Sequence, residues 1–305
     1  MGQLIFETVL NGLQFGIFLF LVAAGLTLVL GIMNFVNLAH GSMFMMGAYV
    51  AAWIFEQSGN FLLAAVVALP VILLLGIVIE YLAFRTIYAR DHLDQVLATF
   101  GCILFFNQMV LVVFGAESQE FKLPASINFP FPLFGFTYPF YRLIVIIAGI
   151  LVAVGLYLAI TRTRVGMRIR AGSSNRAMIG ALGVNVTALY TIVFGIGAAL
   201  AGFAGIMIGP IESVESQMGE EKLILAIVVI VIGGIGSIRG AFIAAIFVGL
   251  VEISGRVFMT DILRAILEEE FAQTAGPALA SMMIYILMAA ILFFKPEGLF
   301  PARTG

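Results

Sequence analysis

Residues Arg162–Gly183 form an arginine-rich segment, RTRVGMRIRAGSSNRAMIGALG, that contains no acidic side chain. The stretches on either side are long, apolar and nearly uncharged. Such a segment lies outside a lipid bilayer, and basic residues in short loops stay on the cytoplasmic side. The chain has 15 lysines and arginines in total. A third of them lie here: Arg162, Arg164, Arg168, Arg170 and Arg176. The segment therefore predicts a membrane protein and marks its cytoplasmic side.

The composition is that of a protein surrounded by lipid. Hydrophobic residues make up 62% of the chain and charged residues 10%, and the mean hydropathy is +1.15. A soluble domain has about 25% charged residues, and a β-barrel would show short alternating segments rather than continuous apolar runs. We predict an all-α, polytopic transmembrane bundle of about eight to ten spans, counting broken and half helices. It forms one domain, 1–305, with a cytoplasmic loop at 162–186. The net charge of −2 argues against a nucleic-acid partner.

The apolar runs give the order of the helices, because a span needs roughly 20 apolar residues. Continuous spans are expected at Leu4–Gly31 (a retained helix), Phe61–Tyr88, Val96–Gly115, Phe140–Ile160, Ala188–Gly209 and Leu279–Phe294. Broken segments are expected at Met43–Phe55, which follows a semi-polar stretch, and at Leu223–Ile232 with Ala241–Ile253. The mixed stretch Arg256–Gln273 fits an amphipathic helix on the membrane surface.

The loops fix the two sides of the membrane. Counted from the arginine-rich segment, Arg85–Asp94 and Lys295–Arg303 fall on the cytoplasmic side. Ala116–Tyr138 and the acidic Pro210–Lys222 fall outside. The N-terminus is external on the condition that both broken segments enter the membrane and return.

Two breaks resemble each other, which suggests an internal repeat. Aligning His40-Gly41-Ser42 with Arg239-Gly240-Ala241 makes the flanking apolar runs coincide. Broken helices at matching positions of two repeats point to a transport pathway in membrane carriers. The predicted pathway residues are Asn34, Asn37, His40, Gly41, Gly233, Gly234, Gly236, Arg239 and Gly240.

Three of the polar residues have simpler interpretations. His40 could be a buried histidine bonded to backbone carbonyls at the break rather than part of a pathway, although a polar residue at membrane depth is a functional hypothesis by default. Arg239 could be solvated at a cytoplasmic turn. Glu80 fits an interfacial position better than a proton relay.

Several chemistries are excluded or disfavoured. No Gly-x-x-x-x-Gly-Lys-[Ser/Thr] motif occurs, so the chain does not bind ATP in that way. The two histidines, His40 and His92, lie in different loops, which disfavours a metal site, and we expect no cofactor. No Gly-x-Ser-x-Gly elbow is present; an intramembrane hydrolase built on Ser42 and His40 is a remote alternative. The lone Cys102 forms no disulfide framework. The chain is predicted not to be an enzyme.

The arginine-rich segment also carries the pattern of a short helix. Ser174 is an expected N-cap, Ser174–Leu182 has small and apolar faces, and Gly183 is an expected stop. The segment could serve only to fix the topology. Five arginines exceed that need, so we interpret it as a docking element for a soluble partner.

Four stretches resemble one family in the right order. Residues 25–49 resemble the N-terminal signature of branched-chain amino-acid ABC transporter permeases of the LivH type. Residues 166–184 resemble that family's cytoplasmic coupling region, 232–245 its third signature, and 296–301 its C-terminal end. Together they cover almost the whole chain. Arg239 and the long stretch Arg256–Gln273 depart from the family's pattern.

The resemblance implies a permease subunit in a bacterial inner membrane. Its expected partners are a second related permease or a second copy of itself, two cytoplasmic ATPase subunits, a periplasmic substrate-binding protein and the surrounding lipid. The two external loops would meet the binding protein. The implied ATPase-coupling residues are Gly166, Arg168, Arg170, Ala171, Asn175, Ala177, Gly180 and Gly183.

The leading hypothesis is therefore the import of branched-chain or related hydrophobic amino acids, driven by a separate ATPase. A permease for urea or short-chain amides is the alternative within transport. A secondary carrier or channel working alone is the alternative from another class, and it is disfavoured by the docking segment and by the shortage of ionisable residues within the spans.

Overall fold

The computed structural model describes residues 2–119 and 123–300, and nearly all of its regular structure is helical, as predicted. The long helices are α1 (Gly2–Met33), α2 (His40–Ser58), α3 (Phe61–Ile79), α4 (His92–Phe114), α5 (Phe140–Arg162), α8 (Val186–Ile208), α9 (Met218–Gly233), α10 (Ile238–Arg264) and α11 (Glu269–Phe294). Seven helices in the described residues are long and apolar enough to span a membrane; α3 counts with its π-helical extension η1 (Glu80–Phe84), and α2 and α9 are outside this set.

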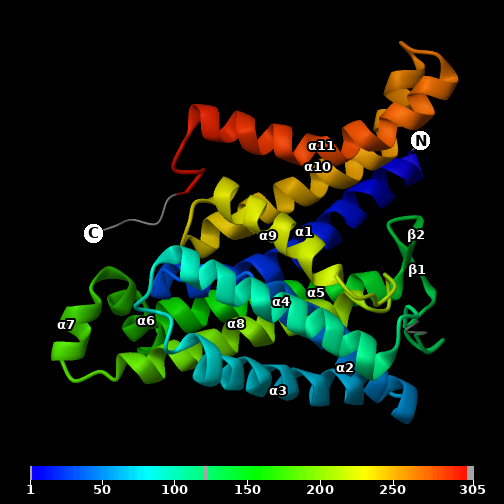
Figure 1. Cartoon of the computed structure of the whole chain (residues 1–305). Helices are drawn as coiled ribbons and strands as arrows, with labels where there is room; N and C mark the ends of the chain where they lie inside the picture. Colours follow the sequence, from blue (N-terminus) through cyan, green and yellow to red (C-terminus); the bar gives the residue numbers. More distant parts are fainter. Residues whose placement is uncertain (1, 120–122, 301–305) are drawn as a thin grey trace.

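The helices run back and forth between two ends of the molecule (Figure 1). One end holds the short helices α6 (Arg164–Ser174) and α7 (Arg176–Ala181), the end of α1 and the break between α9 and α10. The N-terminus lies at the opposite end (Figure 1). Met43–Phe55 lies within the single helix α2, and only the second broken segment consists of two helices, α9 and α10. The external N-terminus stays a prediction.

Burial separates central helices from lipid-facing ones. In the most apolar window of α1, 89% of the residues are buried, against 11% in α11. The apolar side chains exposed on α11 place this helix at the edge of the bundle. The centre is formed by α1 and α8, against which α10, α2 and α3 pack.

Two glycine pairs bring the central helices into backbone contact. A Cβ atom on Gly25 would lie 2.6 Å from the carbonyl oxygen of Gly197, and one on Gly197 would lie 3.1 Å from that of Gly25. Gly41 and Gly219 have the same reciprocal relation: a Cβ atom on either residue would collide with the carbonyl oxygen of the other. Small residues permit this approach of helices in lipid.

These reciprocal contacts change the alignment of the two predicted repeats. They relate α1 to α8 and α2 to α9, so the counterpart of His40-Gly41 is Met218-Gly219 rather than Arg239-Gly240. The remaining contacts agree, because α10 packs on α1 as α3 packs on α8, and α11 meets α9 as α4 meets α2. Equivalent helices run in opposite directions (Figure 1). The chain is thus an inverted repeat, with α5, α6 and α7 between its halves.

The surface helix predicted at Arg256–Gln273 is wrong. No breaker interrupts α10, which continues to Arg264, and α11 begins at Glu269. The charged residues pair along α10 instead: Arg256 Nε donates to Glu252 Oε1 at 2.6 Å, a spacing of one helical turn that favours the helix.

The predicted external loop Ala116–Tyr138 leads into a two-stranded hairpin that the sequence did not predict. β1 (Pro130–Leu133) pairs antiparallel with β2 (Phe136–Pro139). The turn residues Phe134 and Gly135 have φ angles of 50° and 86°, and a turn with two positive φ angles matches the twist of the strands it joins.

The end of α9 is completed by a distant segment. The backbone N–H of Leu299 donates to the Ile232 carbonyl at 2.8 Å, and that of Phe300 donates to the Gly233 carbonyl at 3.0 Å. The last carbonyls of a helix have no partner within it. Leu299 and Phe300 supply partners for two of them.

Candidate coupling surface and pathway residues

The arginine-rich segment folds into two capped helices. The Thr163 hydroxyl accepts a hydrogen bond from the Gly166 N–H at 3.0 Å and caps α6. Asn175 Oδ1 accepts from the Met178 N–H at 2.9 Å and caps α7. The predicted cap at Ser174 is therefore wrong by one residue. The predicted helix Ser174–Leu182 corresponds to α7, and α6 was not predicted. Gly183 ends the segment with a φ of 82°, a conformation that favours glycine.

One face of α6 packs on the bundle and the other is basic. Gly166, Ile169 and Gly172 are buried. A Cβ atom on Gly166 would collide with the Ala159 and Ile160 carbonyls of α5, so only glycine permits the turn from α5 into α6. The side chains of Arg168 and Arg170 are exposed.

The other predicted coupling residues lie at the same end. Ala171, Asn175, Gly180 and Gly183 are exposed, and the side chain of Ala177 lies outside the described part. A Cβ atom on Gly180 would meet only Val186 Cγ2, at 3.8 Å. The surface around Gly180 is thus open to solvent or to a partner.

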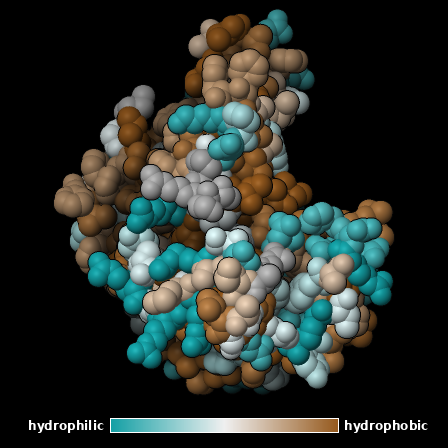
Figure 2. Space-filling model, turned by 90° about the vertical axis from the view of Figure 1, so that its left-hand side faces the viewer, coloured by the Kyte–Doolittle hydropathy of each residue, from teal (hydrophilic) through white to brown (hydrophobic). Residues whose placement is uncertain are grey.

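A cavity of about 570 Å³ lies between α6 and the bundle. It is lined by Arg170 from α6, Asn34 from the first break, and Gly236 and Arg239 from the second break. This cavity lies on the predicted cytoplasmic side and is called the cytoplasmic cavity below. It joins one predicted coupling residue to three predicted pathway residues. In Figure 2, which faces this end, hydrophilic side chains gather on the lower part of the surface.

The other pathway residues lie inside the bundle. His40 is buried, and its Nε2 lies 3.0 Å from the Val22 carbonyl oxygen of α1, to which it donates. The carbonyl belongs to an intact helix rather than to the break. Asn37 is buried, and its Oδ1 has no hydrogen-bond partner in the described residues. Gly41 packs against Gly219 as described above.

The second break is a close backbone contact. Cβ atoms on Gly233 and Gly240 would each collide with the other residue's backbone. Gly234, with a φ of 100°, ends α9. The structure therefore does not bring the nine predicted pathway residues together: three line the cytoplasmic cavity, and the rest lie in the buried interior or at close helix contacts.

The burial of Glu80 inside the protein was not predicted from the sequence. Glu80 is fully buried at the start of η1. Its Oε2 accepts from Arg85 Nη2 at 3.2 Å and from the Thr191 hydroxyl at 2.9 Å, and Oε1 accepts from the Tyr88 hydroxyl at 3.2 Å. Burial and the Glu80 carboxylate raise the pKa of Tyr88, so its hydroxyl remains a donor. The network ties α3 to α8, the helix that follows α7.

Another charged group lies where α9 begins. Lys222 Nζ lies 2.8 Å from Glu212 Oε2 and 5.9 Å from the ring centres of Phe15 and Phe18. Asn107 Nδ2 donates to Glu220 Oε1 at 2.5 Å. The end of the predicted external acidic loop is thus folded into the bundle.

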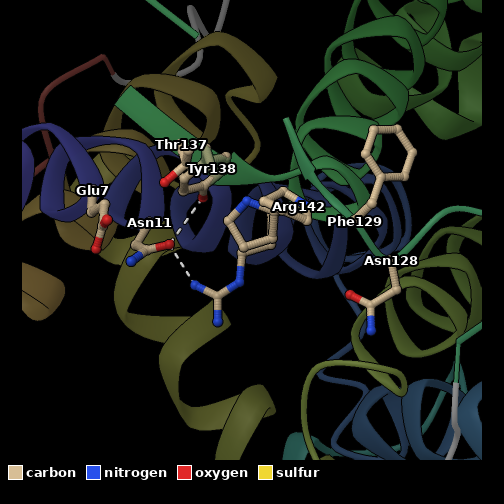
Figure 3. Close-up of a pocket in the computed structure, with 9 residues that line it drawn as sticks. Glu7, Asn11, Asn128, Phe129, Thr137, Tyr138 and Arg142 are labelled. Carbon is tan, nitrogen blue, oxygen red and sulfur yellow. Dashed lines mark hydrogen bonds between the residues drawn. The ribbon is translucent and has the colours of Figure 1, made fainter. Parts of the chain in front are cut away.

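The opposite end holds a cavity of about 460 Å³ between α1, the hairpin and α5 (Figure 3). Asn11 Oδ1 accepts from the Tyr138 hydroxyl at 2.9 Å and from Arg142 Nη1. Burial raises the pKa of Tyr138 to about 12, so this donor stays protonated at neutral pH. The cavity is lined by both a cation, Arg142, and an acid, Glu7 (Figure 3).

A family model and several full-length relatives point to the same family. A family model described as branched-chain amino acid transport system, permease component, matches residues 8–292. The high-affinity branched-chain amino acid transport system permease protein BraD of Pseudomonas aeruginosa is 28% identical over 308 residues, which cover 96% of this chain and 94% of the relative. LivH of Escherichia coli (strain K12), of the same description, is 28% identical over 306 residues, 95% of this chain and 96% of the relative.

An archaeal relative matches as well. The probable branched-chain amino acid transport permease protein LivH of Methanocaldococcus jannaschii is 26% identical over 293 residues, 92% of this chain and 88% of the relative. No solved structure gives a significant match.

Proposed function

Because the chain belongs to the family of permease components of branched-chain amino acid transport systems, we propose that it forms the membrane pathway of an ATP-driven importer for branched-chain or related hydrophobic amino acids. The observation that carries this proposal is the family match over residues 8–292 together with an exposed, basic, two-helix element at one end of the bundle. The chain has no Walker A motif of its own. Energy then comes from a separate subunit.

Two cytoplasmic ATPase subunits are the proposed partners of α6 and α7. The exposed face around Gly180 offers a docking surface, while Gly166 and Ile169 join α6 to α5 and the bundle. A displacement of α7 by the ATPase would also move α8, because only residues 182–185 separate the two helices. The hydrogen bonds of Glu80 would couple this movement of α8 to α3.

A substrate-binding protein is the proposed partner at the external end. The hairpin and the Arg142 cavity lie there, and acidic side chains on a docking protein would complement the arginine.

A second permease subunit, related or identical, would complete the pathway, since the predicted pathway residues of this chain are divided between a cavity and buried contacts.

The test is reconstitution of the complete transporter in proteoliposomes. The complex is purified in mild detergent through a tag on this chain, and its subunits are identified by mass spectrometry. Uptake of labelled leucine, isoleucine and valine is then compared with that of urea and acetamide, with and without ATP at the ATPase side. We expect leucine-type uptake that requires ATP and the binding protein.

Each alternative predicts a different result. Uptake of urea or acetamide in preference to leucine would identify an amide permease. Uptake by this chain alone without ATP would identify a carrier or channel. Either result would overturn the proposal.

A further inference from the structure

We propose that the cytoplasmic cavity binds the phosphate headgroup of an anionic membrane lipid between Arg170 and Arg239. The inference goes beyond the transport function and does not depend on the transported substrate. It rests on the charges, hydrogen-bond donors and position of the cavity.

The cavity carries two positive charges that no acid compensates. None of its lining residues is acidic, and neither arginine has an ion pair within the described residues. Neutral partners hold both side chains: Arg170 Nη1 donates to the Ile160 carbonyl, and Arg239 Nη2 donates to the Tyr157 hydroxyl at 2.6 Å. The Arg239 guanidinium also lies 5.1 Å from the centre of the Tyr157 ring. Two positioned, unpaired guanidinium groups are suited to a phosphate.

Uncharged donors add to the site. The N-terminus of α10 borders the cavity, and Ser237 Oγ caps only the Gly240 N–H. The remaining N–H groups of the first turn carry the positive end of a helix of 27 residues, which favours an anion. Thr27 also lines the cavity; its side chain is 1% exposed and its hydroxyl has no partner in the described residues. A buried, unsatisfied hydroxyl is costly, and a ligand oxygen would satisfy it.

The position favours a lipid over a soluble anion. The cavity lies at the end of α5, a membrane-spanning helix, whose Tyr157 and Leu158 are 39% and 47% exposed. Ile235, in the second break, lines the cavity and is 59% exposed. These apolar surfaces offer contacts for acyl chains beside a headgroup held by the arginines. Basic pockets between helices on the cytoplasmic side bind anionic headgroups in this way.

The experiment compares lipid binding to the full-length chain in nanodiscs. Phosphatidylglycerol retained by the protein is measured by native mass spectrometry against phosphatidylcholine at equal amounts. The cavity variant is Arg170→Gln/Arg239→Gln. The matched control is Arg162→Gln/Arg164→Gln, which removes the same charge from exposed arginines that do not line the cavity.

We expect the cavity variant to lose about thirtyfold in affinity for phosphatidylglycerol, from about one factor of five per arginine near the membrane surface. The control should stay within about twofold of the unmodified protein because its arginines lie outside the cavity. Equal retention by both variants, or no preference for phosphatidylglycerol in the unmodified protein, would overturn the proposal.

Two further arms remove the remaining ambiguities. A photoactivatable phosphatidylglycerol should label peptides that contain residues 157–174 or 235–239 in the unmodified protein, which does not require the variant to fold; labelling only elsewhere would contradict the site. Inorganic phosphate is titrated in phosphatidylcholine nanodiscs. Binding of free phosphate without binding of phosphatidylglycerol would replace the lipid by a soluble anion and so overturn the assignment.

Discussion

Glycine has opposite roles in the bundle interior and in the arginine-rich segment. Gly41 and Gly219 lie so close that neither has space for a Cβ atom. Gly180 and Gly183 of the arginine-rich segment are exposed, with no atom or only one side-chain atom nearby. Interior glycines are therefore required for packing, while those of the segment leave a surface open or permit a left-handed backbone. Substitutions should consequently affect stability inside and coupling outside.

The largest effect on stability is expected for Gly41→Leu. The side chain would be forced into the backbone of α9, and overpacking of this kind costs about 3 kcal/mol or more. Thermal unfolding in detergent should show a strongly lowered midpoint, and insertion should fall. An unchanged midpoint would mean that the α2–α9 contact is not needed for the fold. Gly101→Leu is the control, because a Cβ atom there meets nothing within 4 Å.

Glu80→Gln should come next. The change removes the charge that Arg85, Thr191 and Tyr88 bond to, and weakening bonds to a buried charged group costs roughly 1.5–3 kcal/mol. We expect a moderate loss of thermal stability and a larger loss of transport per ATP hydrolysed, because α3 and α8 lose their link. Loss of stability with full coupling would limit Glu80 to a structural role.

Gly166→Val tests the joint between α5 and α6. Its side chain would collide with two α5 carbonyls, so α6 must shift, at a cost of about 1–3 kcal/mol. The bundle itself should remain intact, since α6 lies at its edge. ATPase stimulation by substrate should fall severalfold while the amount of inserted protein stays normal. Normal stimulation would show that the position of α6 does not matter.

Asn175→Ala removes the cap of α7. Loss of an N-cap costs about 1 kcal/mol, which should raise hydrogen exchange in residues 176–181 without altering the transmembrane helices. Ser174→Ala is the matched neighbour and should have little effect, because the cap is Asn175. The reverse ranking would restore the cap that the sequence suggested.

Gly180→Trp should have the smallest effect on stability and a clear effect on function. The position is exposed and nearly free of neighbours, so the unfolding midpoint should change by no more than the few tenths of a kcal/mol typical of a surface site. A bulky ring on the proposed docking surface should nevertheless lower ATPase binding in pull-down assays. Unchanged binding would exclude this face as the docking site.

The sequence predicted the helical class, the order of the spans and the position of both breaks, because these depend on local hydrophobicity and on glycine. It did not predict the reciprocal glycine contacts. Gly25 and Gly197 are 172 positions apart in the chain, and Gly41 and Gly219 are 178 positions apart. The burial of Glu80 was not predicted for the same reason: its partner Thr191 is 111 residues away. Sequence periodicity does not report such pairs.

Local signals also failed where two interpretations were close. Ser174 and Asn175 are both good caps, and the backbone selected the second. The charges in Arg256–Gln273 resembled a surface helix, yet no residue stops α10 before Arg264. The turn at Phe134 lacks the Asn-Gly or Asp-Gly signal of a tight hairpin.

The bonds from residues 299 and 300 to the end of α9 have a consequence for biogenesis. α9 leaves the ribosome well before these residues do, so its last carbonyls lack these partners while α10 and α11 are being synthesised and inserted. The second break is therefore completed late in assembly. A nascent chain that ends before Leu299 therefore has a second break in which the Ile232 and Gly233 carbonyls lack these two partners.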